Sequence, residues 1–238
     1  MEIYKIRRIR TLIVKIRIFV LVKLGKRLKT MNSENAFDVT VMHNLKGLYH
    51  CNDRVKLLIK PLTAIEKVNK NSKVLIIGPR NEHDLYLMAS EGIKMSNITG
   101  LDLITYSSRI KIGDMHEMEF ADDTFDVVVF GWTLSYSSQP EKAIQEIVRV
   151  TKSGGLVAVG VEYTNLSKED SESLLGYSIQ EHEKLQDRIN STKQIINLFG
   201  SNGGKVYFDH DAPLKRSHTS KEKIQNVSNV AAIVEVIK

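Results

Sequence analysis

The sequence has almost no cysteine, few prolines and no long hydrophobic run. Cys51 is the only cysteine among 238 residues, so an internal disulfide is impossible and we expect a cytoplasmic protein. No P-loop, zinc-ligand spacing, internal repeat or low-complexity segment is present, and no Ser-His-Asp arrangement is visible in the sequence. These absences argue against P-loop nucleotide hydrolases and zinc proteins, and we expect no bound metal.

Basic residues are concentrated at the N-terminus. The net charge is +6, but residues 1–30 contain ten lysines and arginines against the single acid Glu2, which gives this segment a charge of +9. The rest of the chain carries −3. A nucleic-acid-binding face needs a basic surface on the folded domain, so this balance disfavours DNA or RNA as a partner.

Residues 1–30 have the spacing of a basic amphipathic helix. Its longest uncharged run, Ile18 to Val22, is far below the roughly 20 residues that span a bilayer. Two interpretations stay open: a helix lying on an anionic membrane, at its inner face, or a helix packed on protein. The β-branched residues of 12–22 also permit a strand. Read as a helix, the segment places one apolar stripe on a single face: Ile3, Ile6, Ile9, Ile13, Ile16, Val20 and Leu24.

The remaining sequence divides into a polar connector with a helix, residues 31–70, and an α/β domain, residues 71–238. The connector's helix is expected to be interrupted at Pro61. In the domain, helices are predicted between strands, at 82–92 and 139–155, where Gly154-Gly155 end the second. Strands are predicted at 73–78, 97–104, 125–132 and 156–163, with a short element at 110–115.

This alternation of strands and helices predicts a mainly parallel sheet with helices on both faces. Two further strands, residues 205–210 and 230–238, have no predicted helix between them. We therefore expect an antiparallel pair that closes the sheet.

Polar residues and glycines stand where the predicted strands end, which is where open parallel sheets bind ligands. Gly78 ends the first strand in "VLIIGPRNEHD" and would let a ligand approach the backbone. Asp102 follows 24 residues later, at a position that suits a ribose diol. Asp114 and the apolar Met115 suit an adenine amine and ring. An aspartate at a strand end is also a common turn or cap residue, but order and spacing together favour an adenosine site.

The segment "GDMHEMEFADDTFDVVVFGWTLSYSSQPEKAIQEIVRVTKSGGLVAVGVEY" resembles the central block of class I S-adenosylmethionine-dependent methyltransferases, type 11 in particular. The resemblance covers about residues 70–165 and implies a Rossmann-like, seven-stranded fold with S-adenosylmethionine as cofactor. The matching residues follow the family order: Glu119-Phe120, Asp123, Phe125-Asp126, Pro140, Ala143, Glu146, Arg149-Val150 and Gly154-Gly155.

The resemblance also implies roles for individual residues. Asp102, with Leu103 beside it, would hold the ribose hydroxyls, and Asp114 would accept from the adenine amine while Met115 covers the ring. Gly78 would lie against the methionine part of the cofactor. Two residues would line the reaction side of the pocket: Gly131 and Trp132.

The first motif departs from the family pattern. Ile76 stands where an acid usually precedes the glycine, and Pro79 with the following residues replaces further glycines. Arg80 and Glu82 are expected to compensate, because their charges suit the carboxylate and the ammonium of the methionine part. Alternatively they pair with each other or cap the next helix. We predict a modified but working site.

The acceptor is not encoded in a readable motif. His116 could deprotonate a hydroxyl and Tyr136 could orient it, although each is also an ordinary loop residue. Tyr177 and His182 lie in a region where such enzymes build acceptor specificity. We expect a small-molecule, glycan or lipid acceptor. The alternative is a non-catalytic binding module that docks through its basic N-terminus.

Overall fold

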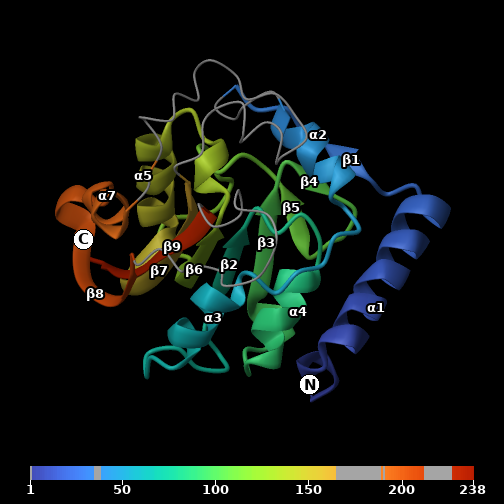
Figure 1. Ribbon diagram of the computed structural model, residues 1–238, viewed down its shortest axis with the longest axis horizontal. Helices are drawn as coiled ribbons and strands as arrows, with labels where there is room; N and C mark the ends of the chain where they lie inside the picture. The colour runs from blue at the N-terminus through green and yellow to red at the C-terminus, as the bar shows by residue number, and fades with distance from the viewer. Residues whose placement is uncertain (1, 35–38, 165–188, 190, 212–226) are drawn as a thin grey trace.

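A seven-stranded sheet in the order β5-β3-β2-β6-β7-β9-β8 forms the centre of the molecule (Figure 1). The computed structural model describes residues 2–34, 39–164, 189, 191–211 and 227–238. The first five strands of this order pair in parallel, whereas β9 pairs antiparallel with both β7 and β8. The expected parallel sheet and its antiparallel C-terminal pair are thus confirmed. The strands are β2 (Val74–Ile77), β3 (Ile98–Asp102), β5 (Ile110–Ile112), β6 (Phe125–Gly131), β7 (Thr151–Thr164), β8 (Gly203–His210) and β9 (Val227–Val236).

Helices cover both faces of the sheet. On one face, α5 (Pro140–Val150) and α7 (Thr192–Asn197) pack against a cluster that includes Leu75 and Ile77. On the other, α3 (Lys56–Thr63) and α4 (His83–Ser90) pack against Val74 and Ile76. Successive residues of a strand point to opposite faces, so β2 must be apolar throughout. This explains the uninterrupted hydrophobic run before Gly78.

Two helix ends differ from the sequence prediction. Helix α5 ends at Val150 because Thr151 already has extended backbone, φ −86° and ψ 135°, and begins β7. Gly154 and Gly155 therefore lie inside this strand, where its pairing with β6 is irregular. Helix α3 continues through Pro61 and ends two residues later, at Thr63, so the disruption that a proline causes in a helix falls in its last turn.

The N-terminal segment is helical, so its strand interpretation is wrong. Helix α1 (Arg7–Ile18) follows a 3-10 turn, η1 (Glu2–Lys5), and continues into a π-helical turn, η2 (Phe19–Leu24). Figure 1 shows α1 at the side of the molecule, beside α4. Among the described residues, no helix combines the length and apolarity needed to cross a membrane.

The face of α1 that packs on the domain is not the predicted apolar stripe. Arg10, Val14 and Ile18 are buried there, and Ile9 and Ile13 are only half-buried. Val14 and Ile18 join a cluster that contains Leu48, Tyr86, Ile104 and Tyr106. The other five stripe residues remain 44–67% exposed: Ile3, Ile6, Ile16, Val20 and Leu24.

The connector brings two further elements to the same edge of the domain. Strand β1 (Lys29–Thr30) pairs antiparallel with β4 (Ile104–Thr105), which follows β3 directly. Helix α2 (Val39–Lys46) lies close to β4. Residues from the connector thereby reach the carboxyl ends of the central strands.

Candidate functional site

A cleft opens at the carboxyl ends of β2, β3, β5 and β6. Its volume is about 1050 Å³, counting the space at its mouth. The cleft is lined by nine of the ten site residues predicted from the sequence, all except Glu82. They are Gly78, Pro79, Arg80, Asp102, Leu103, Asp114, Met115, Gly131 and Trp132.

The loop after β2 keeps a left-handed turn without the expected glycines. Gly78 has φ +68°, and Arg80 has φ +57°, a conformation that costs a non-glycine residue about 1–2 kcal/mol. The Arg80 backbone N–H donates to Asp102 Oδ2 at 2.7 Å, and its Nε donates to Asn44 Oδ1 at 3.3 Å. Trp132 on the opposite wall is left-handed too, with φ +59°. Such strain is typical of ligand sites, where the surroundings hold the chain in place.

Asp102 is buried at the end of β3. Its Oδ1 accepts from Asn44 Nδ2 at 2.9 Å and from the Ile104 N–H at 3.2 Å. Burial raises the pKa of Asp102 to about 6, against the opposing effect of the Arg80 and Ile104 backbone donors. A carboxylate has about four acceptor directions. With three of them used, room for both hydroxyls of a diol requires that one donor leave, and the side chain of Asn44 is the one that can rotate.

Asp114 is tied to His116 rather than standing free in the cleft. Its Oδ1 accepts from the His116 N–H at 2.9 Å and lies 2.5 Å from His116 Nδ1, while Oδ2 accepts from Ser33 Oγ at 2.5 Å. Burial favours a higher pKa, but the donors from His116 and Ser33 outweigh it and hold the pKa of Asp114 well below its ordinary value. Asp114 therefore stays ionised at neutral pH.

His116 is a buried bridge and not a residue of the cleft mouth. It is 1% exposed, and its Nε2 lies 2.6 Å from Ser137 Oγ. Folding thus creates a Ser137-His116-Asp114 arrangement that the sequence analysis missed, because Ser137 stands 21 residues from His116. Ser137 Oγ also accepts from the Gln139 N–H at 3.0 Å and does not line the cleft. The arrangement joins the Asp114 loop to the loop after β6.

Glu82 is buried behind the cleft, which corrects the expected contact with a cofactor ammonium. Its Oε2 accepts from Arg17 Nε at 2.5 Å, and its Oε1 accepts from Ser107 Oγ at 2.6 Å and from Arg109 Nη1 at 3.2 Å. It faces α1 and does not pair with Arg80. Arg17 stands 65 residues before Glu82, so sequence reasoning could not find this partner.

Asp84 supplies an acid to the cleft in place of Glu82. It lies in the first turn of α4 and lines the cleft with Arg54 and Arg80. Burial raises its pKa to about 7, against the opposing effect of these two arginines. The stretch "EHD" contains two candidate acids, Glu82 and Asp84. The start of α4 at His83 decides which one faces the cleft, because neighbouring helical side chains point in different directions.

The wall formed by α2 and the loop after β6 gathers aromatic and basic side chains. The His43 and Tyr136 rings are 5.5 Å apart, and Tyr136 Oη lies 3.5 Å from His43 Nε2. Burial lowers the pKa of His43, and nearby arginines lower it further, so its ring is neutral near pH 7. The Arg54 guanidinium lies 4.3 Å from the centre of the Trp132 ring. His43 and Arg54 were missed because nothing in the sequence brings the connector to this wall.

Two further observations complete the site. Thr40 lines the cleft, and its buried hydroxyl has no hydrogen-bond partner within the described part of the chain. Across the described ranges, no cluster of His, Cys, Asp and Glu could hold a metal ion. Tyr177 and His182 lie outside the described residues.

Residues 78–159 match the family model described as a methyltransferase domain. The matched range contains β3, β5, β6 and α5, together with most of the residues that line the cleft. The resemblance seen in the sequence is therefore confirmed, and the domain has the expected Rossmann-like fold.

Individual curated relatives match the chain over short stretches. A demethylmenaquinone methyltransferase from Desulfitobacterium hafniense is 43% identical over 22% of this chain and 21% of its own. A phosphatidylethanolamine N-methyltransferase from Cereibacter sphaeroides is 29% identical over 37% of this chain and 40% of its own. This chain spans less than half the length of the curated relatives it matches.

A solved structure supports the fold of the domain. Phosphoethanolamine N-methyltransferase 2 from Haemonchus contortus, in complex with S-adenosyl-L-methionine, superposes with a TM-score of 0.53 and 13% sequence identity. The match covers 77% of this chain and 53% of that one.

Proposed function

We propose that the protein is an S-adenosylmethionine-dependent methyltransferase. One observation supports this proposal most directly. The methyltransferase domain brings two acids, Asp102 and Asp114, into one cleft with the turn at Gly78. When bound, the cofactor supplies a methyl group on an electron-poor sulfonium. The chain's own work is then to bind the cofactor, to orient the acceptor and to exclude water.

The residues of the cleft fit the polar parts of this cofactor. Asp102 would accept from the ribose hydroxyls once Asn44 rotates away, and Asp114 would accept from the adenine amine beside Met115. Asp84 is placed to pair with the methionine ammonium. Arg80 would pair with the methionine carboxylate, which is the role expected for it from the sequence.

The acceptor is proposed to be a small molecule, glycan or lipid bound against His43, Tyr136 and Trp132. A neutral His43 can accept a proton from an acceptor hydroxyl or ammonium, and the Tyr136 hydroxyl can orient the acceptor. Two relatives are named for membrane lipids, demethylmenaquinone and phosphatidylethanolamine. This favours a lipid within the class.

Calorimetric titration with S-adenosylhomocysteine tests the proposal. We expect binding and, near pH 7, proton release, because pairing with a cationic ammonium lowers the pKa of Asp84 from about 7. Repeating the titration in two buffers of different ionisation enthalpy measures the released protons. Asp84→Asn should bind more weakly and release far fewer protons. If no heat of binding is measured at millimolar ligand, the proposal fails and the non-catalytic binding module remains as the interpretation.

We also propose that the outer face of the N-terminal helix contacts an anionic membrane surface. That face, defined here by Leu12, Ile16, Phe19 and Val20, is 44–58% exposed. The exposed cations Arg8, Lys15 and Lys23 flank it. An apolar face flanked by cations complements an anionic bilayer, on which each cation contributes about 1 kcal/mol.

Vesicle co-sedimentation tests this surface without disturbing the packed face of α1. We expect the protein to pellet with phosphatidylglycerol vesicles, less so at high salt, and to stay in solution with phosphatidylcholine vesicles. The triple variant Leu12→Gln, Ile16→Gln, Phe19→Gln should lose pelleting while its thermal unfolding is unchanged. Equal pelleting of the variant and the parent would rule the surface out.

A further inference from the structure

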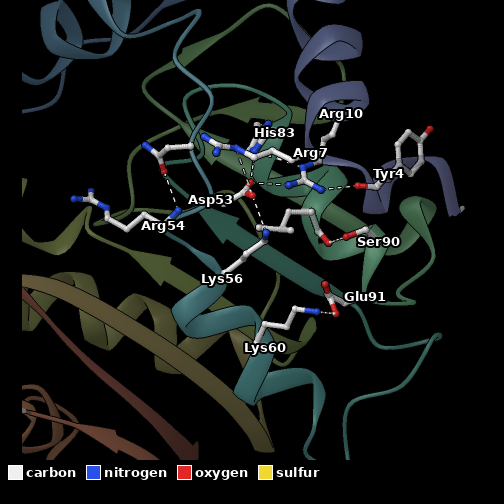
Figure 2. Close-up of polar contacts among 12 residues, drawn as sticks. Tyr4, Arg7, Arg10, Asp53, Arg54, Lys56, Lys60, His83, Ser90 and Glu91 are labelled. Atoms are coloured by element: carbon white, nitrogen blue, oxygen red, sulfur yellow. Dashed lines mark hydrogen bonds and ion pairs between the residues drawn. The ribbon is translucent and has the colours of Figure 1, made fainter. Parts of the chain in front are cut away.

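The loop of residues 78–84, which lacks the further glycines of the family pattern, is held by contacts with the N-terminal part of the chain. Arg80, Asn81, Glu82 and His83 each contact a residue or backbone carbonyl from positions 10–55. None of these partners belongs to the matched range 78–159. Figure 2 shows part of this region, where Arg10 of α1 and Asp53 of the connector converge on His83.

The first contact joins α1 to the carboxylate of Glu82. Arg17 donates through Nε to Oε2 at 2.5 Å and through Nη2 to Oε1 at 3.0 Å, a two-bond geometry that fixes both side chains. Glu82 is fully buried, so its carboxylate oxygens depend on Arg17, Arg109 and Ser107 for their hydrogen bonds. Removing one partner of a buried charge is strongly destabilising locally.

The second contact is a group of three charged or polar residues in which Arg10 and His83 are buried and Asp53 is half-buried. Arg10, 1% exposed, donates through Nη2 to Asp53 Oδ1 at 2.6 Å, and His83 Nε2 lies 2.8 Å from the same oxygen (Figure 2). Burial would raise the pKa of Asp53, but donors from Lys56, His83 and Arg10 outweigh it and hold the pKa well below its ordinary value. Asp53 is therefore an ionised anchor between α1 and α4.

The third contact joins the two walls of the cleft directly. Asn81 Nδ2 donates to the backbone carbonyls of Leu48 at 2.9 Å and His50 at 3.0 Å. Asn81 and His50 both line the cleft. Asn81 and Asp84 thus line the cleft, whereas Glu82 and His83 contact α1 and the connector.

We infer that the loop residues that replace the glycine pattern and helix α1 with the connector form one structural unit. Arg17 and Arg10 are positioning residues: through Glu82 and the Asp53–His83 pair they hold residues 78–84 in the conformation that binds the cofactor. The conformation of the loop, which glycines permit in the family pattern, here depends on charged side chains supplied by α1. This inference rests on the proposed function for its ligand.

The test combines Arg17→Met with a matched control on the same helix, Arg8→Met, which removes an exposed cation of the outer face. Hydrogen–deuterium exchange of the amides of 78–84, in protein without ligand, reads the loop directly. Amides of β6 serve as the internal reference for global opening. We expect faster exchange in the loop alone for Arg17→Met, and S-adenosylhomocysteine affinity lower by about tenfold, equivalent to 1.4 kcal/mol.

Arg17→Lys keeps the charge and should restore part of the protection, whereas Arg8→Met should match the parent in both measurements. If Arg17→Met loosens β6 as well, Glu82→Gln replaces it, because that variant keeps the Ser107 bond and tests the same contact. Unchanged loop exchange in the variants overturns the inference. So does a loosened loop with unchanged affinity. A parent protein that binds no ligand, while its variants show the expected exchange pattern, would refute the proposed function but not the support of residues 78–84 by α1.

Discussion

Replacing Asp102 by alanine is expected to weaken S-adenosylhomocysteine binding by about 100-fold. The ionised carboxylate would accept from the ribose hydroxyls, and two hydrogen bonds to a charged group contribute about 1.5 kcal/mol each. The same substitution removes the acceptor of the Arg80 N–H, at 2.7 Å, so the strained turn also loses its support. Calorimetry measures the affinity, and thermal unfolding shows whether the variant is folded.

A ligand without ribose hydroxyls separates these two effects. The 2′,3′-dideoxy form of the ligand should bind the parent much more weakly than the normal ligand does, but Asp102→Ala should bind both equally. Asp209→Ala, an exposed acid on β8, is the matched control and should behave as the parent. If the two ligands differ as much in Asp102→Ala as in the parent, Asp102 is not the ribose residue.

The pH dependence of binding follows from the same carboxyl group. Its pKa in the folded protein is raised from 3.8 to about 6, so ligand affinity should increase as the pH rises through 6, and Asp102→Asn should flatten this increase. Without ligand the sign is opposite for stability. The folded state binds this proton more tightly than the unfolded chain, so its contribution is lost as the pH rises through the same window.

The sequence predicted the strands and the positions at their ends well, because periodicity and glycine placement are local signals. Asp102, Asp114 and Gly131 lie where the pattern placed them, at one edge of a parallel sheet. The connection of Glu82 to Arg17 and of His116 to Ser137 depended on contacts between distant segments. Contacts of this kind produce no periodic pattern in the sequence.

The N-terminal helix shows that a periodic pattern can also predict the wrong packed face. Its apolar spacing predicted a stripe, but burial selected a face that contains Arg10, whose guanidinium finds Asp53 and a backbone carbonyl within 2.6 Å. A charge is normally excluded from a packed face unless it is paired. The stripe of Ile16 and Val20 was left exposed as a result.

Gly78→Ala tests how the site-forming turn is built, and we expect a loss of about 2–4 kcal/mol in stability. A Cβ at this position would lie 2.1 Å from Thr133 Oγ1 and 2.7 Å from Thr133 Cγ2, and the residue has φ +68°. The loss therefore combines a backbone penalty of about 1 kcal/mol with a clash. Ligand binding should fall too, because Gly78 and Thr133 both line the cleft.

Two further variants separate the clash from the backbone strain. Gly200 has φ +53° and nothing within 4 Å of an added Cβ, so Gly200→Ala isolates the backbone penalty. Adding Thr133→Ala to Gly78→Ala leaves the nearest Thr133 atom, its Cβ, at 3.0 Å, and should recover most of the difference in urea unfolding. A Gly78→Ala loss no larger than that of Gly200→Ala would mean that Thr133 moves aside freely. The close approach of the β2 and β6 loops would then be a consequence of the fold, and the glycine would serve the turn alone.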